Sequence, residues 1–179
     1  ETAVNGTFAA RTLRYGKARK GQQEDTPMTR TAIVTGSAQG IGRGIAERLA
    51  RDGLSVTLAD LPANKDALAE AARVITKAGG ACRTAFADVS DQSQVDALVA
   101  DHVAALGGLD VMVANAGVTL IARFMDTTPE ILNRTFDINF KGVFHCYAAA
   151  ARQMIAQGRG GRLIAACSIS GHKGGDWVS

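Results

Sequence analysis

The sequence predicts an α/β domain in which helices cover both faces of a parallel β-sheet. Two observations lead to this prediction. Five short apolar runs alternate along the chain with four stretches of helical periodicity. The apolar runs are nearly continuous, which is typical of parallel strands buried on both faces. Right-handed crossovers between such strands then favour a doubly wound sheet.

The expected elements follow in order along the chain. The strand-like runs are rich in aliphatic and β-branched residues and are bounded by turn residues. We expect these strands at 31–35, 54–60, 82–89, 109–117 and 162–168. The intervening stretches repeat apolar residues at helical spacing. We expect these helices at 41–51, 66–78, 93–106 and 129–157, the last as two pieces.

The composition indicates one globular domain of ordinary size. The chain has 179 residues, of which 46% are hydrophobic, with 20 Gly and 3 Pro. Such a chain can bury a sizeable core between tight turns. Its apolar runs are all shorter than the roughly 20 residues of a membrane span, so no membrane partner is expected. The three cysteines suit neither a zinc site nor a disulfide framework, so we expect buried, reduced thiols in a cytoplasmic protein: Cys82, Cys146 and Cys167.

The net charge of +3 is concentrated near the N-terminus. Residues 1–30 hold six basic and three acidic residues, whereas residues 31–179 hold fourteen of each. A neutral body offers no electrostatic case for nucleic acid, so none is expected as a partner. A basic N-terminal segment that binds nucleic acid is a weaker alternative.

The first 27 residues lack apolar periodicity, and Met28 precedes the first apolar run. We therefore divide the chain into a disordered basic leader or extension at 1–27 and a domain portion at 28–179. The arginines of the leader leave a mitochondrial transit peptide as an alternative to a cytoplasmic location: Arg11, Arg14 and Arg19.

A glycine-rich turn, TGSAQGIG at 35–42, joins the first expected strand to the first expected helix. Glycine permits the sharp bend and leaves room where a pyrophosphate approaches the backbone, and the N–H groups at the helix start attract phosphate. The G-x-x-x-G-x-G spacing departs from G-x-G-x-x-G, and a purely structural turn is the alternative. The strand–turn–helix context favours a dinucleotide site whose predicted residues are Gly36, Ser37, Gln39, Gly40, Ile41 and Gly42.

Asp60 ends the second expected strand, 18 residues after Gly42. A carboxylate there can accept hydrogen bonds from the ribose hydroxyls of the cofactor, and it repels a 2′-phosphate. The neighbouring Gln39 and Leu61 are neutral, so no cation at either position would receive that phosphate. The sequence therefore favours NAD over NADP, although Asp60 could instead simply cap a turn.

These features and four later motifs occur in one order that resembles the short-chain dehydrogenase/reductase family. The later motifs are Asp88-Val89, Asn115-Ala116-Gly117, NFKGVF at 139–144, and Ser168. The resemblance covers 31–179 and is strongest to the diacetyl/acetoin reductase and 2,3-butanediol dehydrogenase group, as in QGIG, DVSDQSQV and LGGLDVMVANAGV. The related 3-oxoacyl, polyol and sugar reductases share much of this pattern. The resemblance implies a Rossmann fold, here incomplete after the fifth strand.

The resemblance also implies roles for individual residues at the cofactor. Asp88 and Val89 would flank the adenine, with the carboxylate meeting its exocyclic amine. Asn115, Ala116 and Gly117 would end the fourth strand beside the cofactor, where small residues admit the ribose closely.

Two catalytic residues are implied in the same way. Asn139 would sit at a helix irregularity, where its backbone carbonyl holds a water in a proton relay. Ser168 would hydrogen-bond the substrate oxygen, with Ser170 as a competitor for this role. His145 and His172 lack an acidic partner in the sequence and are weak candidates for a base.

The family's chemistry implies a Tyr followed four residues later by a Lys, which would give a proton to the substrate oxygen. The two tyrosines of this chain are Tyr15 and Tyr147, and they have Arg19 and Ala151 at that spacing. We therefore expect that the chain is a fragment that ends before this pair, is inactive alone, and leaves its fifth strand as an open sheet edge. The full-length form would be a homotetramer.

Two principal functions thus remain open. One is an NAD(H)-dependent oxidoreductase that interconverts a small ketone or diketone and its alcohol. The other is a non-catalytic NAD-binding or interaction fragment. The ordered site residues favour the oxidoreductase, because a fold alone does not select a function.

Overall fold

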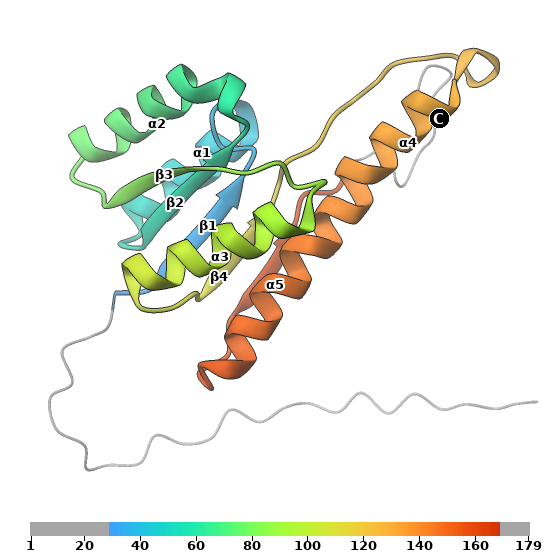
Figure 1. The fold of residues 1–179 in the computed structure, drawn as a ribbon. Helices are drawn as coiled ribbons and strands as arrows, with labels where there is room; N and C mark the ends of the chain where they lie inside the picture. The colour runs from blue at the N-terminus through green and yellow to red at the C-terminus, as the bar shows by residue number, and fades with distance from the viewer. Residues whose placement is uncertain (1–28, 169–179) are drawn as a thin grey trace, which may run out of the picture.

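The computed structural model describes residues 29–168. Five parallel strands form one sheet in the order β3-β2-β1-β4-β5 (Figure 1). The strands are β1 (Thr31–Thr35), β2 (Ser55–Asp60), β3 (Cys82–Phe86), β4 (Val111–Ala114) and β5 (Arg162–Ala165). The strand order reverses between β1 and β4, so the predicted doubly wound α/β domain is confirmed. The predicted leader at 1–27 lies outside the described residues.

Within 29–168, five α-helices lie between the strands along the chain. They are α1 (Gly40–Arg51), α2 (Lys65–Lys77), α3 (Gln92–Leu106), α4 (Pro129–Phe136) and α5 (Gly142–Ala156). Helices α1 and α2 cover one face of the sheet, while α3 and α5 cover the other (Figure 1). Short 3₁₀ turns, η1 (Pro62–Asn64) and η2 (Phe124–Asp126), precede α2 and α4, and a π-helical segment, η3 (Asp137–Lys141), joins α4 directly to α5.

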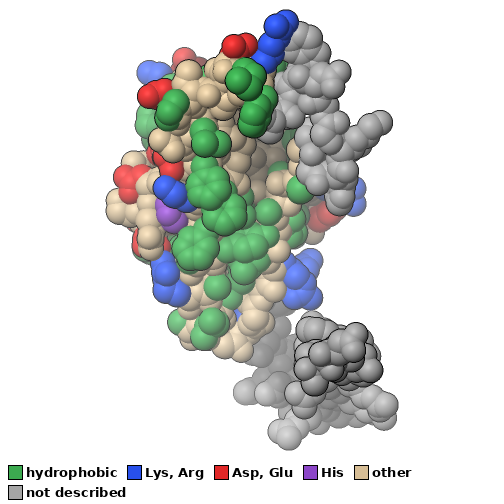
Figure 2. All heavy atoms as spheres, turned by 90° about the vertical axis from the view of Figure 1, so that its right-hand side faces the viewer, with side chains coloured by type: hydrophobic (Ala, Val, Ile, Leu, Met, Phe, Trp, Pro, Cys, Tyr) green, Lys and Arg blue, Asp and Glu red, His purple; other side chains and the backbone are tan. Residues whose placement is uncertain are grey.

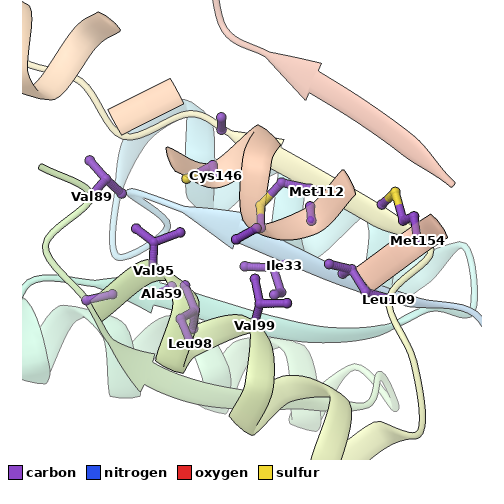
Figure 3. Close-up of a cluster of buried hydrophobic side chains, with 14 residues drawn as sticks. Ile33, Ala59, Val89, Val95, Leu98, Val99, Leu109, Met112, Cys146 and Met154 are labelled. Carbon is purple, nitrogen blue, oxygen red and sulfur yellow. The ribbon is translucent and has the colours of Figure 1, made fainter. Parts of the chain in front are cut away.

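The central strand β1 is buried on both faces because its alternate side chains enter two separate cores. Ile33 packs with Val95, Met112 and Cys146 between the sheet and α3/α5, and Figure 3 shows these side chains pointing toward one another. Val34 enters the other core, against α1 and α2. This two-sided burial explains why the strand sequences are continuously apolar rather than alternating.

A buried histidine of α3 joins this helix to β1 and β2. His102 is fully buried; its Nδ1 lies 2.7 Å from Oγ1 of Thr57 and its Nε2 lies 3.1 Å from Oγ1 of Thr31. Because the Thr31 hydroxyl donates to the carbonyl of Gly108, Nε2–H donates to Thr31, and Nδ1 accepts from Thr57. Burial, with a smaller contribution from Arg83, lowers the pKa of His102 to about 4. The ring is therefore neutral near pH 7.

Strand β5 lies at the sheet edge, as expected from the sequence. All four of its residues are exposed, and among the described strands it pairs only with β4. The expected burial of all three cysteines is wrong: Cys146 is buried, Cys82 is half-buried, and Cys167, just beyond β5, is exposed. Within 29–168, no helix has both the length and the apolar character needed to span a bilayer.

Candidate functional site

A cleft of about 460 Å³ lies where β1, β2 and β4 end, at the point where the strand order reverses. Its size is typical of small-molecule sites, and its position is the usual ligand site of open α/β sheets. The residues that line it are Gly36, Gln39, Ile41, Gly42, Asp60, Leu61, Asn64, Ala87, Asp88, Val89, Asn115, Ala116, Gly117, Val118, Arg134 and Ile138.

The glycine turn brings the N-terminus of α1 to this cleft. Gly36 has a φ of +64°, and a Cβ there would lie 2.8 Å from the Cα of Ala116. A Cβ on Gly42 would overlap the carbonyl of Gly36 and the side chain of Asn115. Gly40, with a φ of +56°, faces open space. The two close approaches explain why the turn requires glycine at 36 and 42.

The first turn of α1 carries features that suit an anion. Its N-cap residue, Gln39, makes no side-chain capping hydrogen bond, and the first turn contains no acidic residue. Ile41 is 75% exposed and lines the cleft. The backbone N–H groups of this turn can therefore face a phosphate, which the helix dipole also favours.

Asp60 is held rigidly at another part of the cleft wall. Its Oδ2 accepts from the backbone N–H of Ala38 at 2.8 Å. Its Oδ1 accepts from the backbone N–H of Leu61 at 2.8 Å and from Nδ2 of Asn64 at 2.7 Å. The residue is only 9% exposed, yet it lines the cleft. A fixed carboxylate is thus presented to whatever binds there.

A second network joins the turn to the end of β4. The hydroxyl of Thr35 accepts from the backbone N–H groups of Asn115 and Ala116, each at 3.1 Å. The Asn115 amide donates in turn to the carbonyls of Thr35 and Gly36, at 3.0 and 3.2 Å. This arrangement fixes the cleft wall at the end of β4.

Asp88 and Val89 lie in the loop after β3, where the chain leaves the sheet. Asp88 Oδ1 accepts from the backbone N–H and the hydroxyl of Ser90, at 2.9 and 2.7 Å. The Val89 carbonyl accepts from Nδ1 of His145 at 2.9 Å. His145 therefore supports the cleft wall, and a structural role accounts for it without a catalytic one.

Asn139 lies in the π-helical segment η3, which is the kind of helix irregularity expected there. Its Oδ1 accepts from the backbone N–H of Val118, and its Nδ2 donates to the Val118 carbonyl, both at 2.8 Å. Val118 and Gly117 line the cleft, but Asn139 does not. The side chain thus positions the cleft wall from behind, while the backbone of η3 departs from regular α-helical bonding.

Ser168 is exposed and lies three residues past the end of β5. The backbone N–H of Ala166 donates to the carbonyl of Ala114 at 3.1 Å, so the chain continues beside β4 toward the cleft side of the sheet. Tyr147 packs against the α3/α5 core and does not line the cleft. Ser170 and His172 lie outside the described residues.

Two of the predicted cofactor residues, Ser37 and Gly40, are not among the residues that line the cleft. Ser37 is buried and bonds the carbonyl of Ala59 through its N–H and its hydroxyl, so it joins β1 to β2 instead. Sequence reasoning did not identify the lining residues Asn64, Ala87, Val118, Arg134 and Ile138. Pro62, which starts a turn after the strand, was a usable signal for Asn64.

Comparison with known proteins agrees with this geometry. The family model described as short chain dehydrogenase matches residues 30–179. A short-chain dehydrogenase/reductase of Armillaria gallica is 50% identical over 145 residues, covering 81% of this chain and 56% of the relative. A diacetyl reductase, (S)-acetoin forming, of Staphylococcus epidermidis is 42% identical over 146 residues, covering 82% and 56%.

A solved structure also resembles this chain. The structure of a short chain dehydrogenase/reductase from Burkholderia phymatum in complex with NAD matches with a TM-score of 0.79 and 27% identity, covering 84% of this chain and 53% of that one. The chain therefore spans a little over half the length of the proteins it matches. On its fold, its cleft and these matches, the chain belongs to the short-chain dehydrogenase/reductase family.

Proposed function

We propose that the cleft binds NAD(H) for an oxidoreductase reaction. One observation carries the proposal: the Asp60 carboxylate and the uncapped start of α1 line the same cleft. The pyrophosphate would lie at the N–H groups of the α1 turn, and the adenosine ribose at Asp60. The residues around Asp60, namely Gln39, Leu61 and Asn64, carry no positive charge. This surrounding favours NAD over NADP.

The remaining predicted cofactor residues fit the same binding mode. Asp88 Oδ1 already bonds Ser90, so Oδ2 is the oxygen left to accept from the adenine amine. Val89 would pack beside the ring. The small residues Ala116 and Gly117 give a ligand close access to the backbone at the end of β4.

The proposed reaction interconverts a carbonyl and an alcohol. A bound nicotinamide accepts or delivers hydride. In this chain, the Ser168 hydroxyl would donate a hydrogen bond to the substrate oxygen where negative charge develops. The η3 backbone at Asn139 would hold a water that relays a proton. Both roles rest on the family resemblance, on the place of Asn139 in η3, and on the course of the chain past β5 toward Ser168.

We propose a small ketone or diketone, of the diacetyl/acetoin type, as the substrate class. The diacetyl reductase among the relatives supports this choice, whereas a 3-oxoacyl, polyol or sugar substrate is the alternative within the family. A panel of diacetyl, acetoin, sorbitol and a 3-oxoacyl thioester, tested with a form of the protein that continues past Ser179, separates these substrate classes. Preference for sorbitol or the thioester would contradict the diacetyl assignment.

The 179 residues alone should bind the cofactor without turning it over. They contain no Tyr with Lys four residues later, and Tyr147 lies away from the cleft. The test is a pair of measurements on this chain, NADH binding by calorimetry and NADH oxidation with diacetyl. Binding without oxidation also fits a non-catalytic NAD-binding fragment, so turnover by the longer protein decides between the two functions. Robust oxidation by the 179 residues would contradict this expectation.

We further propose a cytoplasmic location and, for the full-length form, a homotetramer. Figure 2 shows apolar side chains gathered on the face that α4 and α5 present. Exposed aromatic residues of α4, η3 and α5 include Phe136, Phe140 and Phe144. The rings of Phe136 and Phe140 stack with their centroids 4.7 Å apart. An exposed apolar surface of this kind supports self-association. Analytical ultracentrifugation of the longer protein tests the tetramer, and a monomer at micromolar concentration would contradict it.

A further inference from the structure

Asn64 lines the cleft beside Asp60. We propose that Asn64 recognises the adenosine ribose jointly with Asp60 and thereby helps to exclude a 2′-phosphate. This inference rests on the proposed dinucleotide function of the cleft. It makes the cofactor preference depend on a pair of residues rather than on the charge of Asp60 alone.

The local fold places Asn64 at this position. The 3₁₀ turn η1 begins at Pro62, directly after Leu61, and reverses the chain toward the end of β2. The backbone N–H of Asn64 donates to the carbonyl of Leu61 at 2.9 Å, and its side-chain Nδ2 donates to Asp60 Oδ1 at 2.7 Å. A carboxylate only accepts hydrogen bonds, so the amide nitrogen must be the atom that faces Asp60. The side-chain carbonyl of Asn64 therefore points away from Asp60.

Asp60 has little remaining capacity to bind both ribose hydroxyls. An ionised carboxylate offers about four lone-pair positions, two on each oxygen. Oδ1 already accepts from Leu61 and Asn64, and Oδ2 already accepts from Ala38. One position on Oδ2 remains. The adenosine ribose of NAD has two adjacent hydroxyls, so one of them needs a second acceptor.

The Asn64 side-chain carbonyl can be that acceptor. Within 29–168 its Oδ1 has no hydrogen-bond partner. It is carried by the same side chain that bonds Asp60 Oδ1, and both residues line the cleft. Asp60 Oδ2 and Asn64 Oδ1 thus offer two acceptors to the two hydroxyls of the ribose.

The same pair is unfavourable for a 2′-phosphate. The phosphate oxygens accept hydrogen bonds and carry negative charge, so two acceptors leave them unpaired. Asn64 could present its amide to the phosphate only by rotating away from Asp60, which breaks a charge-assisted hydrogen bond. Asp60 and Asn64 therefore discriminate against the 2′-phosphate through their hydrogen-bonding pattern as well as through charge.

The test is calorimetric titration of the 179-residue chain with NADH and with NADPH. Three variants are compared with the wild type: Asn64→Ala, Asn64→Asp and the control Asn133→Ala, which makes the same change at an exposed residue of α4 outside the cleft lining. Circular dichroism first establishes that each variant is folded.

Asn64→Ala removes the acceptor and should weaken NADH binding roughly fivefold to tenfold, with little loss for NADPH. The preference for NADH therefore falls by about the same factor. Asn64→Asp keeps an acceptor but replaces the amide that donates to Asp60 with a second carboxylate, so it should weaken the binding of both nucleotides. The added negative charge disfavours the 2′-phosphate further, so its preference for NADH over NADPH should equal or exceed that of the wild type. Asn133→Ala should leave both affinities unchanged.

A loss that is equal for NADH and NADPH in Asn64→Ala would mean that Asn64 only stabilises the turn, and it would overturn this inference while leaving the proposed function intact. If the preference for NADH over NADPH fell in Asn64→Asp as much as in Asn64→Ala, the inference would also be overturned. A folded wild-type chain that binds neither nucleotide would overturn the proposed function itself, and the inference with it.

Discussion

The two sides of the sheet differ sharply in how they are supported. On one side, β1 and β2 are buried on both faces, and their carboxyl ends carry Asp60 and Thr35 in satisfied hydrogen-bond networks. On the other side, β5 is exposed along its whole length, and Ser168 follows it on exposed backbone. The side proposed to bind the cofactor is therefore preorganised by its own contacts. The side proposed to hold the substrate oxygen is not comparably packed within the described residues.

A matched pair of isoleucines tests this contrast with the largest expected effect. Ile33 in β1 is fully buried, whereas Ile164 in β5 is 49% exposed. Ile33→Ala should lower the free energy of unfolding by about 4 kcal/mol, because it leaves a cavity in the α3/α5 core. Ile164→Ala should cost less than about 1 kcal/mol. Urea denaturation measures both, and equal losses would contradict the contrast between the two sides.

Two glycines of α1 give the next largest effect. Gly42→Ala places a Cβ against the backbone of Gly36 and the side chain of Asn115, so it should cost about 3 kcal/mol and abolish nucleotide binding. Gly44 lies on the exposed side of the same helix and faces open space. Gly44→Ala should stabilise the protein by about 0.5–1 kcal/mol. Thermal unfolding and NADH titration compare the two variants, and similar outcomes would refute the close packing at Gly42.

The buried His102 makes the free energy of unfolding depend on pH. The pKa of His102 is about 4 in the folded protein and about 6.5 when unfolded. As the pH falls below 6.5, the unfolded state takes up the proton first, so stability declines until about pH 4 and is unaffected by this group above 6.5. The loss at pH 4 is at most about 3 kcal/mol.

Urea denaturation between pH 7 and pH 4 measures this loss. The variant His102→Gln should lack most of the decline in that window, although it is less stable at pH 7. Asp91, whose pKa is lowered to about 2 by hydrogen bonds from Ser93 and Gln94, loses its ionised native contacts mainly at lower pH. Parallel curves for the wild type and His102→Gln would exclude His102 as the cause.

Removal of the Thr35 hydroxyl should have the smallest effect on the free energy of unfolding. Thr35→Val retains the shape but leaves the N–H groups of Asn115 and Ala116 without their acceptor, so it should cost about 2 kcal/mol. Thr35→Ser keeps the hydroxyl and should cost about 1 kcal/mol or less. Chemical denaturation separates the variants, and a Thr35→Ser loss as large as that of Thr35→Val would assign the effect to the lost methyl group.

Sequence patterns predicted most of the fold because the burial of apolar side chains determines both the sequence pattern and the arrangement of the strands and helices. The continuous apolar runs indicated the strands, but three of them were predicted too long at the C-terminal end: β3 ends at Phe86 rather than 89, β4 at Ala114 rather than 117, and β5 at Ala165 rather than 168. The extra residues after β3 and β4 line the cleft and do not pair in the sheet. Periodicity alone does not separate residues that line a cleft from residues that pair in a sheet.

The residues that line the cleft were predictable where they belong to one local motif. They were less predictable where segments distant in the sequence meet. Gly36, Gly42 and Asp60 follow directly from strand–turn–helix logic. Arg134 reaches the cleft from α4 and Ile138 from η3, far along the chain, and no local pattern marks them. Pro62 marks a turn before Asn64, but the hydrogen bond from Asn64 to Asp60 depends on the fold of η1 and not on a local sequence pattern.

The most direct test of the central claim is a pair of calorimetric titrations of the wild-type 179-residue chain, one with NADH and one with NADPH. A fixed carboxylate at the ribose end of the cleft predicts that NADH binds at least about tenfold more tightly, a difference of about 1.4 kcal/mol. NADPH binding that is equal to or tighter than NADH binding would contradict the account.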